Sequence, residues 1–339
     1  MEEFGATGLE SDVDSRGGPV RTISFRSLAG SLLTLTLLGS TVAYATVSAP
    51  TTPDDQSGRV QAGLTLTSLP SNVNPSLAMA RQITGTPTAL NHYLGKLTVC
   101  DPARKAKYAT TPIPCYFGDT RATKTAVLFG DSSTFAWTTA LNDQLKKGHV
   151  RLALFEFSGC PSPDVTSTPT YFSRSWRSCN TWHKALAKAT AKLHPFVVMS
   201  SSAAYETSSA DTAWIQGYVK AFNDLAPSRT TTRILLGTSP WFVQPVPACI
   251  AAHVTSLANC TLHYTSGSQY GLALTRDVTI ANLAGATLVP TVGWLCYQNA
   301  CPVVIDNSMV YRDGDHIFES YATHIGRLVA SELAKAGLH

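Results

Sequence analysis

The pattern of apolar and polar residues after about residue 95 predicts strands that alternate with helices. Short apolar runs with the length and composition of buried strands lie at 125–129, 150–157, 196–199, 233–237 and 286–289. Amphipathic stretches with one apolar helical face lie at 135–147, 180–193, 211–225, 270–283 and 319–336. This alternation predicts a three-layer α/β domain, in which helices cover both faces of a mainly parallel sheet.

The first 45 residues have the order of a secretory signal. Three arginines (Arg16, Arg21 and Arg26) precede an apolar run at 28–38, and Ala43-Tyr44-Ala45 follows that run as a small-residue cleavage pattern. A single uncleaved membrane anchor is the alternative, because residues 27–47 are just long enough to span a bilayer. Both interpretations place the rest of the chain outside the cytoplasm, either secreted or anchored.

The remaining chain divides by its composition. Residues 46–95 are interpreted as a linker and N-terminal extension, in which the segment 46–75 is rich in Thr, Ser, Pro, Gly and Asp and has little to bury. Residues 96–339 hold the predicted α/β domain. Within that domain the segments 158–178 and 239–268 are predicted to be long loops, and long loops inside compact domains are usually functional.

The composition excludes several classes of protein. With 44% hydrophobic and 14% charged residues among 339, the chain has ample apolar mass for a core and is not disordered. It has no internal repeat, which excludes fibrous and solenoid architectures. Its net charge of +4 is too small, and its Lys and Arg residues are too scattered, for a nucleic-acid binder. Ordinary solvated charge explains this balance, and association with anionic envelope polymers is compatible with it.

The cysteines agree with export to an oxidising compartment. There are eight, and they fall as close neighbours along the chain. Eight cysteines allow 105 pairings, so spacing proves none of them. The simplest proposal pairs them in order, because each bridge then closes a short loop, and zinc is disfavoured because no C-x₂-C spacing occurs. This proposal gives the bridges Cys100–Cys115, Cys160–Cys179, Cys249–Cys260 and Cys296–Cys301.

Polar residues follow the predicted strands where a ligand is expected. In open α/β sheets ligands bind at the carboxyl ends of the strands, so the residues directly after each strand are the candidates for chemistry. The segments in question are Gly130-Asp131-Ser132-Ser133, Ser158-Gly159-Cys160-Pro161, Ser200-Ser201-Ser202 and, before the last helix, Tyr311-Arg312-Asp313-Gly314-Asp315-His316.

Ser132, His316 and Asp313 are the candidates for a serine mechanism. A serine at a strand-to-helix turn exposes its hydroxyl, and N–H groups at the helix start can stabilise an oxyanion. The serine needs a base, and a histidine held by a carboxylate is the usual one. Asp313 and His316 are three residues apart, so one helical turn places them on the same face, whereas Asp315 is expected to point elsewhere. Taken singly, Gly-Asp-Ser is a common turn and His316 an ordinary histidine.

Together these motifs resemble the SGNH hydrolase superfamily. More narrowly, residues from about 96 to 339 resemble the extracytoplasmic SGNH domain fused to many bacterial membrane acyltransferases of family three. The resemblance is carried by CYFGDTRATKTAVLFGDSSTFAWTTAL (115–141), FSGCPSPD (157–164) and WLCYQNACPVVIDNSMVYRDGDHIFESYATHIGRLVASEL (294–333). It implies a flavodoxin-like α/β/α fold, with Ser132 as nucleophile, His316 as base and Asp313 as its orienting partner. The N–H groups of Ser132 and Gly159 would form the oxyanion hole.

The sequence departs from the superfamily pattern at two places. The block that usually reads GDSH ends in Ser133 here, at a position that is not a triad member. The block that usually reads Gly-x-Asn-Asp is Ser201-Ser202-Ala203-Ala204, so the asparagine donor to the oxyanion is missing at Ala203. Fused acyltransferase domains often lack that asparagine, which favours this subfamily over a general esterase. Ser201 or Ser202 is an additional candidate donor, Ser201 being preferred.

The resemblance implies serine-dependent transfer of an acyl group, acetyl being expected, to or from hydroxyls of cell-envelope glycans through an acyl-enzyme on Ser132. The implied partner is an envelope glycan or acylated carbohydrate. Because the chain has at most one membrane segment, a separate membrane acyltransferase is a candidate acyl donor. A secreted carbohydrate esterase with water as acceptor and a catalytically silent glycan-binding domain are the alternatives. No metal or other cofactor, and no nucleic acid, is implied.

Overall fold

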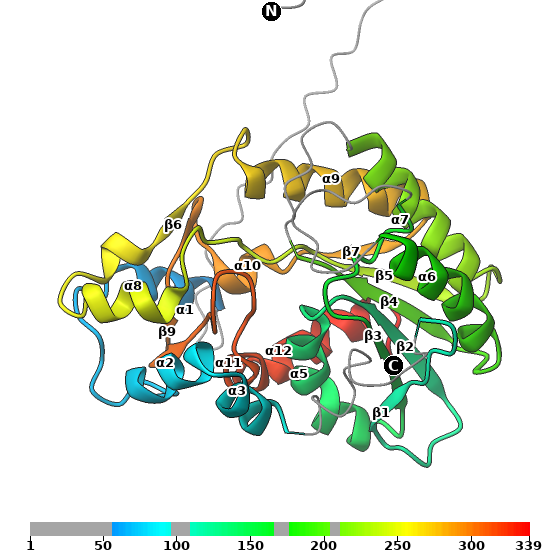
Figure 1. Cartoon of the computed structure of the whole chain (residues 1–339), viewed down its shortest axis with the longest axis horizontal. Coiled ribbons are helices and arrows are strands. Elements are labelled where there is room, and N and C mark those ends of the chain that lie inside the picture. Colours follow the sequence, from blue (N-terminus) through cyan, green and yellow to red (C-terminus); the bar gives the residue numbers. More distant parts are fainter. Residues whose placement is uncertain (1–55, 96–108, 166–175, 204–210) are drawn as a thin grey trace, which may run out of the picture. The chain divides into compact units, whose positions relative to one another are not determined.

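A six-stranded, mostly parallel sheet forms the centre of the molecule (Figure 1). The computed structural model describes residues 56–95, 109–165, 176–203 and 211–339. The strand order is β1-β3-β2-β4-β5-β7, in which only β1 is antiparallel to its neighbour. The strands are β1 (Cys115–Gly118), β2 (Thr125–Gly130), β3 (Arg151–Glu156), β4 (Val197–Ser201), β5 (Thr232–Leu236) and β7 (Thr287–Val289).

Helices cover both faces of this sheet, which makes three layers. Because side chains alternate along a strand, Ala126 and Leu128 of β2 face one core while Val127 and Phe129 face the other. The first core packs under α5 (Thr134–Lys147), α11 (Glu319–His324) and α12 (Gly326–Lys335). The second packs under α6 (Trp176–Ala191), α7 (Asp211–Leu225) and α9 (Gln269–Ala284). The predicted flavodoxin-like α/β/α fold class is confirmed.

The predicted C-terminal helix at 319–336 is interrupted. It consists of α11 and α12, which meet at Ile325 and Gly326. The second helix begins directly against the backbone of α5, where a Cβ on Gly326 would lie 2.5 Å from the carbonyl oxygen of Ala140. This close contact with a distant helix is not visible in the local apolar pattern.

The segment 46–75, predicted to be a linker with little to bury, contains α1 (Gln56–Leu64). This helix packs through small residues: Val60 is fully buried, and a Cβ on Gly63 would lie 2.5 Å from the carbonyl oxygen of Val304. The helices α2 (Leu77–Gly85) and α3 (Pro87–Leu94) follow, and α2 adds Ala80 and Ile83 to the first core. The prediction failed because α1 packs closely against the backbone at Val304 through a glycine. A helix packed in this way can be buried with few large apolar side chains, so its apolar pattern is weak.

The predicted loop 239–268 also contains regular structure. It holds α8 (Val246–Ala252), the 3₁₀ helix η2 (Leu257–Cys260) and β6 (Leu262–His263). Short two-stranded pairings join β6 to β8 (Ala300–Cys301) and β9 (Val304–Ile305) to β10 (Ser308–Met309), and α10 (Val292–Leu295) precedes them. No helix within the described ranges is both long and apolar enough to cross a membrane.

Three disulfides fasten these irregular segments. They are Cys160–Cys179, Cys249–Cys260 and Cys296–Cys301, as the pairing in sequence order predicted. Cys115 is also disulfide-bonded, and Cys100, its predicted partner, lies outside the described residues.

Candidate active site

Ser132 lies at the point where the strand order of the sheet reverses. It follows β2, whose two neighbours are β3 and β4, and it precedes the first residue of α5. Such a switch point is where open α/β sheets bind ligands. The turn needs glycine at position 130, because a Cβ there would lie 2.3 Å from the carbonyl oxygen of Ser201 and 2.6 Å from Ser162 Oγ. A close-packed glycine turn therefore presents Ser132.

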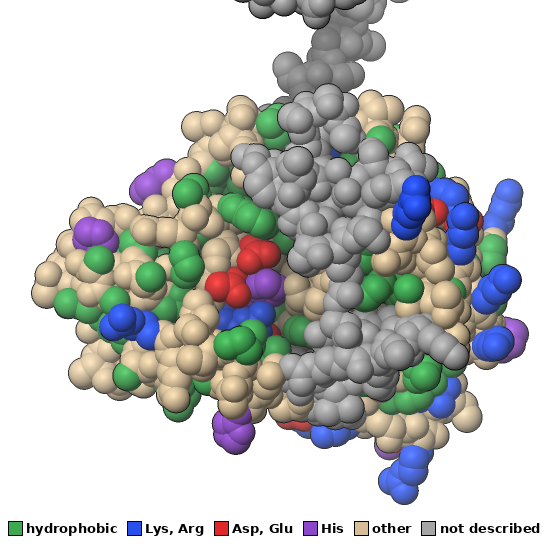
Figure 2. Space-filling model, in the orientation of Figure 1, with side chains coloured by type: hydrophobic (Ala, Val, Ile, Leu, Met, Phe, Trp, Pro, Cys, Tyr) green, Lys and Arg blue, Asp and Glu red, His purple; other side chains and the backbone are tan. Residues whose placement is uncertain are grey.

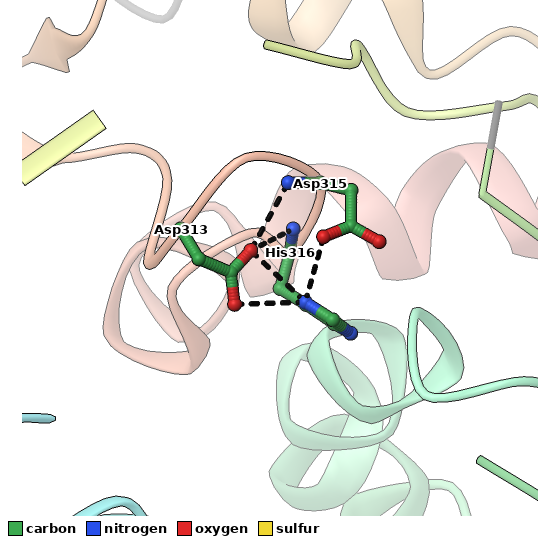
Figure 3. Close-up of side chains that lie close together, drawn as sticks. All are labelled: Asp313, Asp315 and His316. Carbon is green, nitrogen blue, oxygen red and sulfur yellow. Dashed lines mark hydrogen bonds and ion pairs between the residues drawn. The ribbon is translucent and has the colours of Figure 1, made fainter. Parts of the chain in front are cut away.

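His316 lies beside this serine, and acidic side chains lie beside the histidine. The Oγ of Ser132 and Nε2 of His316 are 2.6 Å apart, and Nδ1 of His316 is 2.9 Å from Oδ2 of Asp313. Figure 2 shows acidic side chains next to a histidine near the middle of one face, and Figure 3 shows both aspartates close to the imidazole. The three predicted residues are thus in hydrogen-bond contact.

The contact between Asp313 and His316 arises in a loop, not in the helical turn that the sequence suggested. Oδ1 of Asp313 accepts hydrogen bonds from the backbone N–H groups of Asp315 and His316, at 3.0 and 2.9 Å. The side chain therefore closes a tight turn on itself, a role for which aspartate is favoured. Gly314 is required in this turn because a Cβ there would lie 2.8 Å from the carbonyl oxygen of Phe242.

The sequence predicted that Asp315, which is adjacent to His316, points away from it. In the structure Asp315 points toward the imidazole. Its Oδ1 lies 3.2 Å from Nδ1 of His316, so two carboxylates flank the same ring nitrogen. The expectation was wrong because it assumed helical geometry, in which neighbouring side chains diverge. In the observed turn, residues next to each other in sequence converge on one point (Figure 3).

The two carboxylates favour the protonated imidazole. Burial by itself would lower the pKa of His316, but the negative charges of Asp313 and Asp315 raise it well above its usual value. For Asp313, burial by itself would raise the pKa. The charge and hydrogen bonds of His316, together with the charge of Arg312, instead hold that pKa well below its usual range. The site therefore stabilises an imidazolium paired with an ionised aspartate.

A buried ion pair between Arg312 and Glu319 stabilises the loop that carries Asp313 and His316. Arg312 is 3% exposed, and its guanidinium donates to Oε1 of Glu319 at 2.7 Å. The Nε of Arg312 lies 3.7 Å from Oδ2 of Asp313, and its backbone N–H donates to the carbonyl of His316 at 2.8 Å. This pair ties the loop 311–316 to the first turn of α11.

Asp131 is a site residue whose role the sequence reasoning missed. Its side chain is fully buried, and Oδ1 accepts from the N–H of Ser133 at 3.0 Å and from the Ser133 hydroxyl. Its Oδ2 accepts from the Ser202 hydroxyl at 2.8 Å and from the N–H of Ala203 at 3.2 Å. Asp131 therefore joins the turn after β2 to the segment after β4. The only sequence signal was its place beside the candidate nucleophile.

The predicted oxyanion donors are two backbone N–H groups. The N–H groups of Ser132 and Gly159 donate to no other described residue, and the two residues follow the neighbouring strands β2 and β3. Of the two additional candidates, Ser202 donates its hydroxyl hydrogen to Asp131. Ser201 is fully buried, and its Oγ accepts from the indole N–H of Trp137 at 3.0 Å. Ala203 carries no polar side chain. The Ser201 hydroxyl keeps its own hydrogen to donate, so it remains a candidate beside the two backbone N–H groups.

The same acidic cluster is the only group of described residues with the spacing of a metal site. Ligand atoms of Asp313, Asp315 and His316 lie within 4.8 Å of one another. However, both ring nitrogens of His316 are already used, because Nδ1 donates to Asp313 and Nε2 contacts the Ser132 hydroxyl. The donor set therefore fits a hydrogen-bonded relay better than a cation.

A comparison with solved structures finds chains that are similar in fold to this one. The periplasmic domain of a lipopolysaccharide acetyltransferase from Salmonella ser. Paratyphi A matches with a TM-score of 0.52 and 13% identity, over 76% of this chain and 95% of that one. The carbohydrate acetylesterase Est24 from Sinorhizobium meliloti (TM-score 0.38, 13% identity, 62% and 99% coverage) and an aryl esterase from M. smegmatis (0.39, 11%, 63% and 99%) are also similar. A search of the curated proteins finds no relative.

The family comparison covers most of the folded chain. The family model described as "SGNH domain (fused to AT3 domains)" matches residues 99–331. This range includes every strand of the central sheet and all residues of the candidate site. The chain therefore belongs to the family of SGNH domains that are fused to AT3 domains.

Proposed function

We propose that this protein transfers acyl groups, acetyl being the expected one, to or from hydroxyl groups of extracytoplasmic glycans. The observation that carries the proposal is the chain of contacts from Ser132 through His316 to Asp313, at 2.6 and 2.9 Å. This sequence of hydroxyl, imidazole and carboxylate is the arrangement that activates a serine nucleophile. The family membership and the similarity to an acetyltransferase domain support the same reaction class.

In the first half-reaction, Ser132 Oγ attacks the carbonyl carbon of an acyl ester while His316 Nε2 takes the hydroxyl proton. The N–H groups of Ser132 and Gly159 are the donors to the oxyanion of the tetrahedral intermediate, worth a few kcal/mol each in related sites. Collapse of this intermediate breaks the bond to the leaving alcohol, which receives the proton from His316. An acyl-enzyme ester on Ser132 remains.

In the second half-reaction, a glycan hydroxyl attacks the acyl-enzyme and gives its proton to His316. Collapse of the second intermediate returns that proton to Ser132 and releases the acylated glycan. The negative charges of Asp313 and Asp315 stabilise the imidazolium of each intermediate. The family association with AT3 domains supports a membrane acyltransferase as the source of the acyl group, and the periplasmic neighbour supports an extracytoplasmic location.

Hydrolysis is the second candidate, and the exposure of the site favours including it. The side chains of Asp313 and His316 are 27% and 19% exposed, so water has access to the relay. Water as acceptor would make the protein a carbohydrate esterase with the same residues in the same roles. Acetate released without a glycan acceptor would identify this reaction, and an acceptor-dependent product would identify transfer.

The direct test uses p-nitrophenyl acetate with the wild type, Ser132→Ala and His316→Ala. We expect each substitution to reduce turnover by about 10⁴-fold or to background, because the members of a relay act as a unit. His324→Ala on α11 and Ser331→Ala on α12 are matched controls away from the relay and should keep normal turnover. If the wild type and both relay variants gave equal rates with p-nitrophenyl acetate and with glycan esters, the serine mechanism would be refuted. The alternative of a catalytically silent glycan-binding domain would then be favoured.

A further inference from the structure

A groove on the surface is lined by three lysines and three threonines. It has a volume of about 380 Å³ and lies between one side of α6 and the segment from Thr110 to Pro112. Lys184 and Lys188 on α6, and Lys192 directly after it, line the groove together with the hydroxyl residues. Its other members are small: Thr110, Thr111, Pro112, Thr181, Ala185 and Ala189.

The spacing of these lysines presents their charges as a row. Residues four apart lie on the same face of a helix, so the three ammonium groups follow one line about 12 Å long. All three side chains are exposed. Figure 2 shows that Lys and Arg side chains gather on the side of the molecule where α6 lies in Figure 1.

Within the described ranges, none of the three lysines contacts an acidic side chain. Other lysines of the domain do: Lys220 contacts Asp164 at 2.8 Å, and Lys335 contacts Glu332 at 2.7 Å. Basic residues near a helix C-terminus stabilise the helix through its dipole, which accounts for a position such as Lys192. The helix dipole does not account for Lys184, which lies in the middle of α6. It also does not explain why all three lysines line one groove.

The lining fits an elongated anionic glycan better than a membrane surface. Membrane-binding faces expose large apolar side chains beside the basic ones, whereas the apolar members of this groove are two alanines and a proline. Ammonium groups and hydroxyls together suit carboxylate or phosphate groups on a sugar chain. The start of α6 is bonded through Cys179 to Cys160, next to Gly159, so the row leads away from the candidate active site.

We propose that this groove binds an anionic glycan, whose acidic groups contact Lys184, Lys188 and Lys192. The inference rests on the proposed function for the statement that the substrate is a glycan, and it adds that this glycan carries negative charge. The groove would hold part of the chain while another part reaches Ser132. It is a binding site and contributes no step to the reaction.

The test measures binding of a fluorescent oligogalacturonate and of a neutral dextran oligosaccharide to the full chain by anisotropy at low salt. The wild type should bind the oligogalacturonate in preference to dextran, and added salt should weaken this binding. Substituting all three lysines (K184Q, K188Q and K192Q) should weaken it by about tenfold, the effect of removing three exposed charge pairs. The control K146Q, K147Q and K335Q changes the net charge equally and should bind within about twofold of the wild type.

Three outcomes would overturn the proposal: equal loss in both triple variants, equal binding of dextran, or binding of anionic phospholipid vesicles but not oligogalacturonate through the same lysines. Ser132→Ala separates this proposal from the proposed function, because it should bind oligogalacturonate as the wild type does. Selective binding without any acyl-transfer activity would refute the chemistry and support the groove. Activity without selective binding would refute the groove alone.

Discussion

At the scale of single residues, the two carboxylates beside His316 have separable effects on the pH dependence of turnover. In the proposed reaction His316 must be neutral to accept the proton of Ser132, so activity should rise with pH through the pKa of His316. Asp313 and Asp315 raise that pKa, which moves the acidic limb of the profile above its position for an ordinary histidine. Asp315→Asn removes one of these charges, and we expect the limb to shift to lower pH with little loss of plateau kcat.

The pH dependence of kcat/KM from about pH 4 to about pH 10 measures this shift. Asp313→Asn is the informative comparison, because it also removes the contact that orients the ring, and we expect kcat to fall by about 10⁴-fold. Asp143→Asn, at an exposed position near the end of α5, is the control and should leave the profile in place. A limb that does not move in Asp315→Asn would show that Asp315 has no influence on the base.

Asp131 is expected to position the nucleophile without contacting the substrate. The four hydrogen bonds that it accepts from described residues come from donors on the segments after β2 and β4. In Asp131→Asn the amide group cannot accept at both ends, so we expect the free energy of unfolding to fall by about 1–3 kcal/mol. We also expect kcat to fall at least tenfold while KM stays nearly constant, since the Ser132 turn loses its support.

Chemical denaturation and steady-state kinetics on the same preparations test this expectation. Ser202→Ala removes a single donor to Asp131 and is the matched control, with a loss of about 1 kcal/mol and a small effect on kcat. A purely structural role would predict that both variants lose stability and keep the wild-type kcat of their folded fraction.

At the scale of elements, the disulfide Cys160–Cys179 fastens the segment that carries Gly159 to the start of α6. The two cysteines are 19 residues apart, and closing a loop of that order stabilises a fold by about 3 kcal/mol in the chain-entropy description. We expect Cys160→Ser with Cys179→Ser to lower the free energy of unfolding by about that amount and to reduce kcat, because the Gly159 donor loses its anchor.

Thermal unfolding and turnover of that double variant provide the check, with Cys249→Ser and Cys260→Ser as the comparison. The second disulfide joins α8 to η2 and does not adjoin Gly159. Its removal should therefore lower stability while the folded protein keeps most of its kcat. Equal kinetic losses in the two variants would contradict the anchoring role of Cys160.

The elements of the sheet could be predicted from the sequence because their signal is local. In the run 125–129 every residue after Thr125 is apolar, and β2 is buried along its whole length. The helix α1 and the break between α11 and α12 could not be predicted in this way. Each depends on a glycine in contact with a distant backbone: Gly63 against Val304, and Gly326 against Ala140. Contacts of this kind exist only after the chain has folded.

The candidate site divides in the same manner. Ser132 could be found because its motif directly follows a strand of the parallel sheet, and His316 because its motif directly precedes the last helices of the chain. The contact of Asp315 with His316 and the four hydrogen bonds of Asp131 depend on loop conformation. The spacing of residue types along the chain does not determine that conformation. The positions of these two carboxylates in the site therefore become visible only in the folded structure.

At the scale of the whole molecule, residues 56–95 contribute side chains to the core of the domain. These residues precede the range of the family match, which begins at residue 99. Val60 and Ile83 are 0% and 3% exposed in the core that also lies under α5 and α12. Full burial of each such side chain contributes about 1.5–3 kcal/mol, and a domain is stable by only about 5–15 kcal/mol in total. The N-terminal helices are therefore a substantial part of the stability of the fold.

These helices also contact the loop of the candidate site. The Thr84 hydroxyl donates to the carbonyl oxygen of Arg312 at 2.7 Å, and the Tyr93 hydroxyl accepts from the N–H of Ser320 at 3.2 Å. A chain that begins at residue 96 should consequently unfold at lower temperature and turn over more slowly than one that begins at residue 46. Thr84→Val in the longer chain isolates the contact with Arg312, and we expect it to lower kcat more than stability. If the shorter chain unfolded as cooperatively and at the same temperature as the longer one, residues 56–95 would be an accessory to the fold and the core would be complete without them.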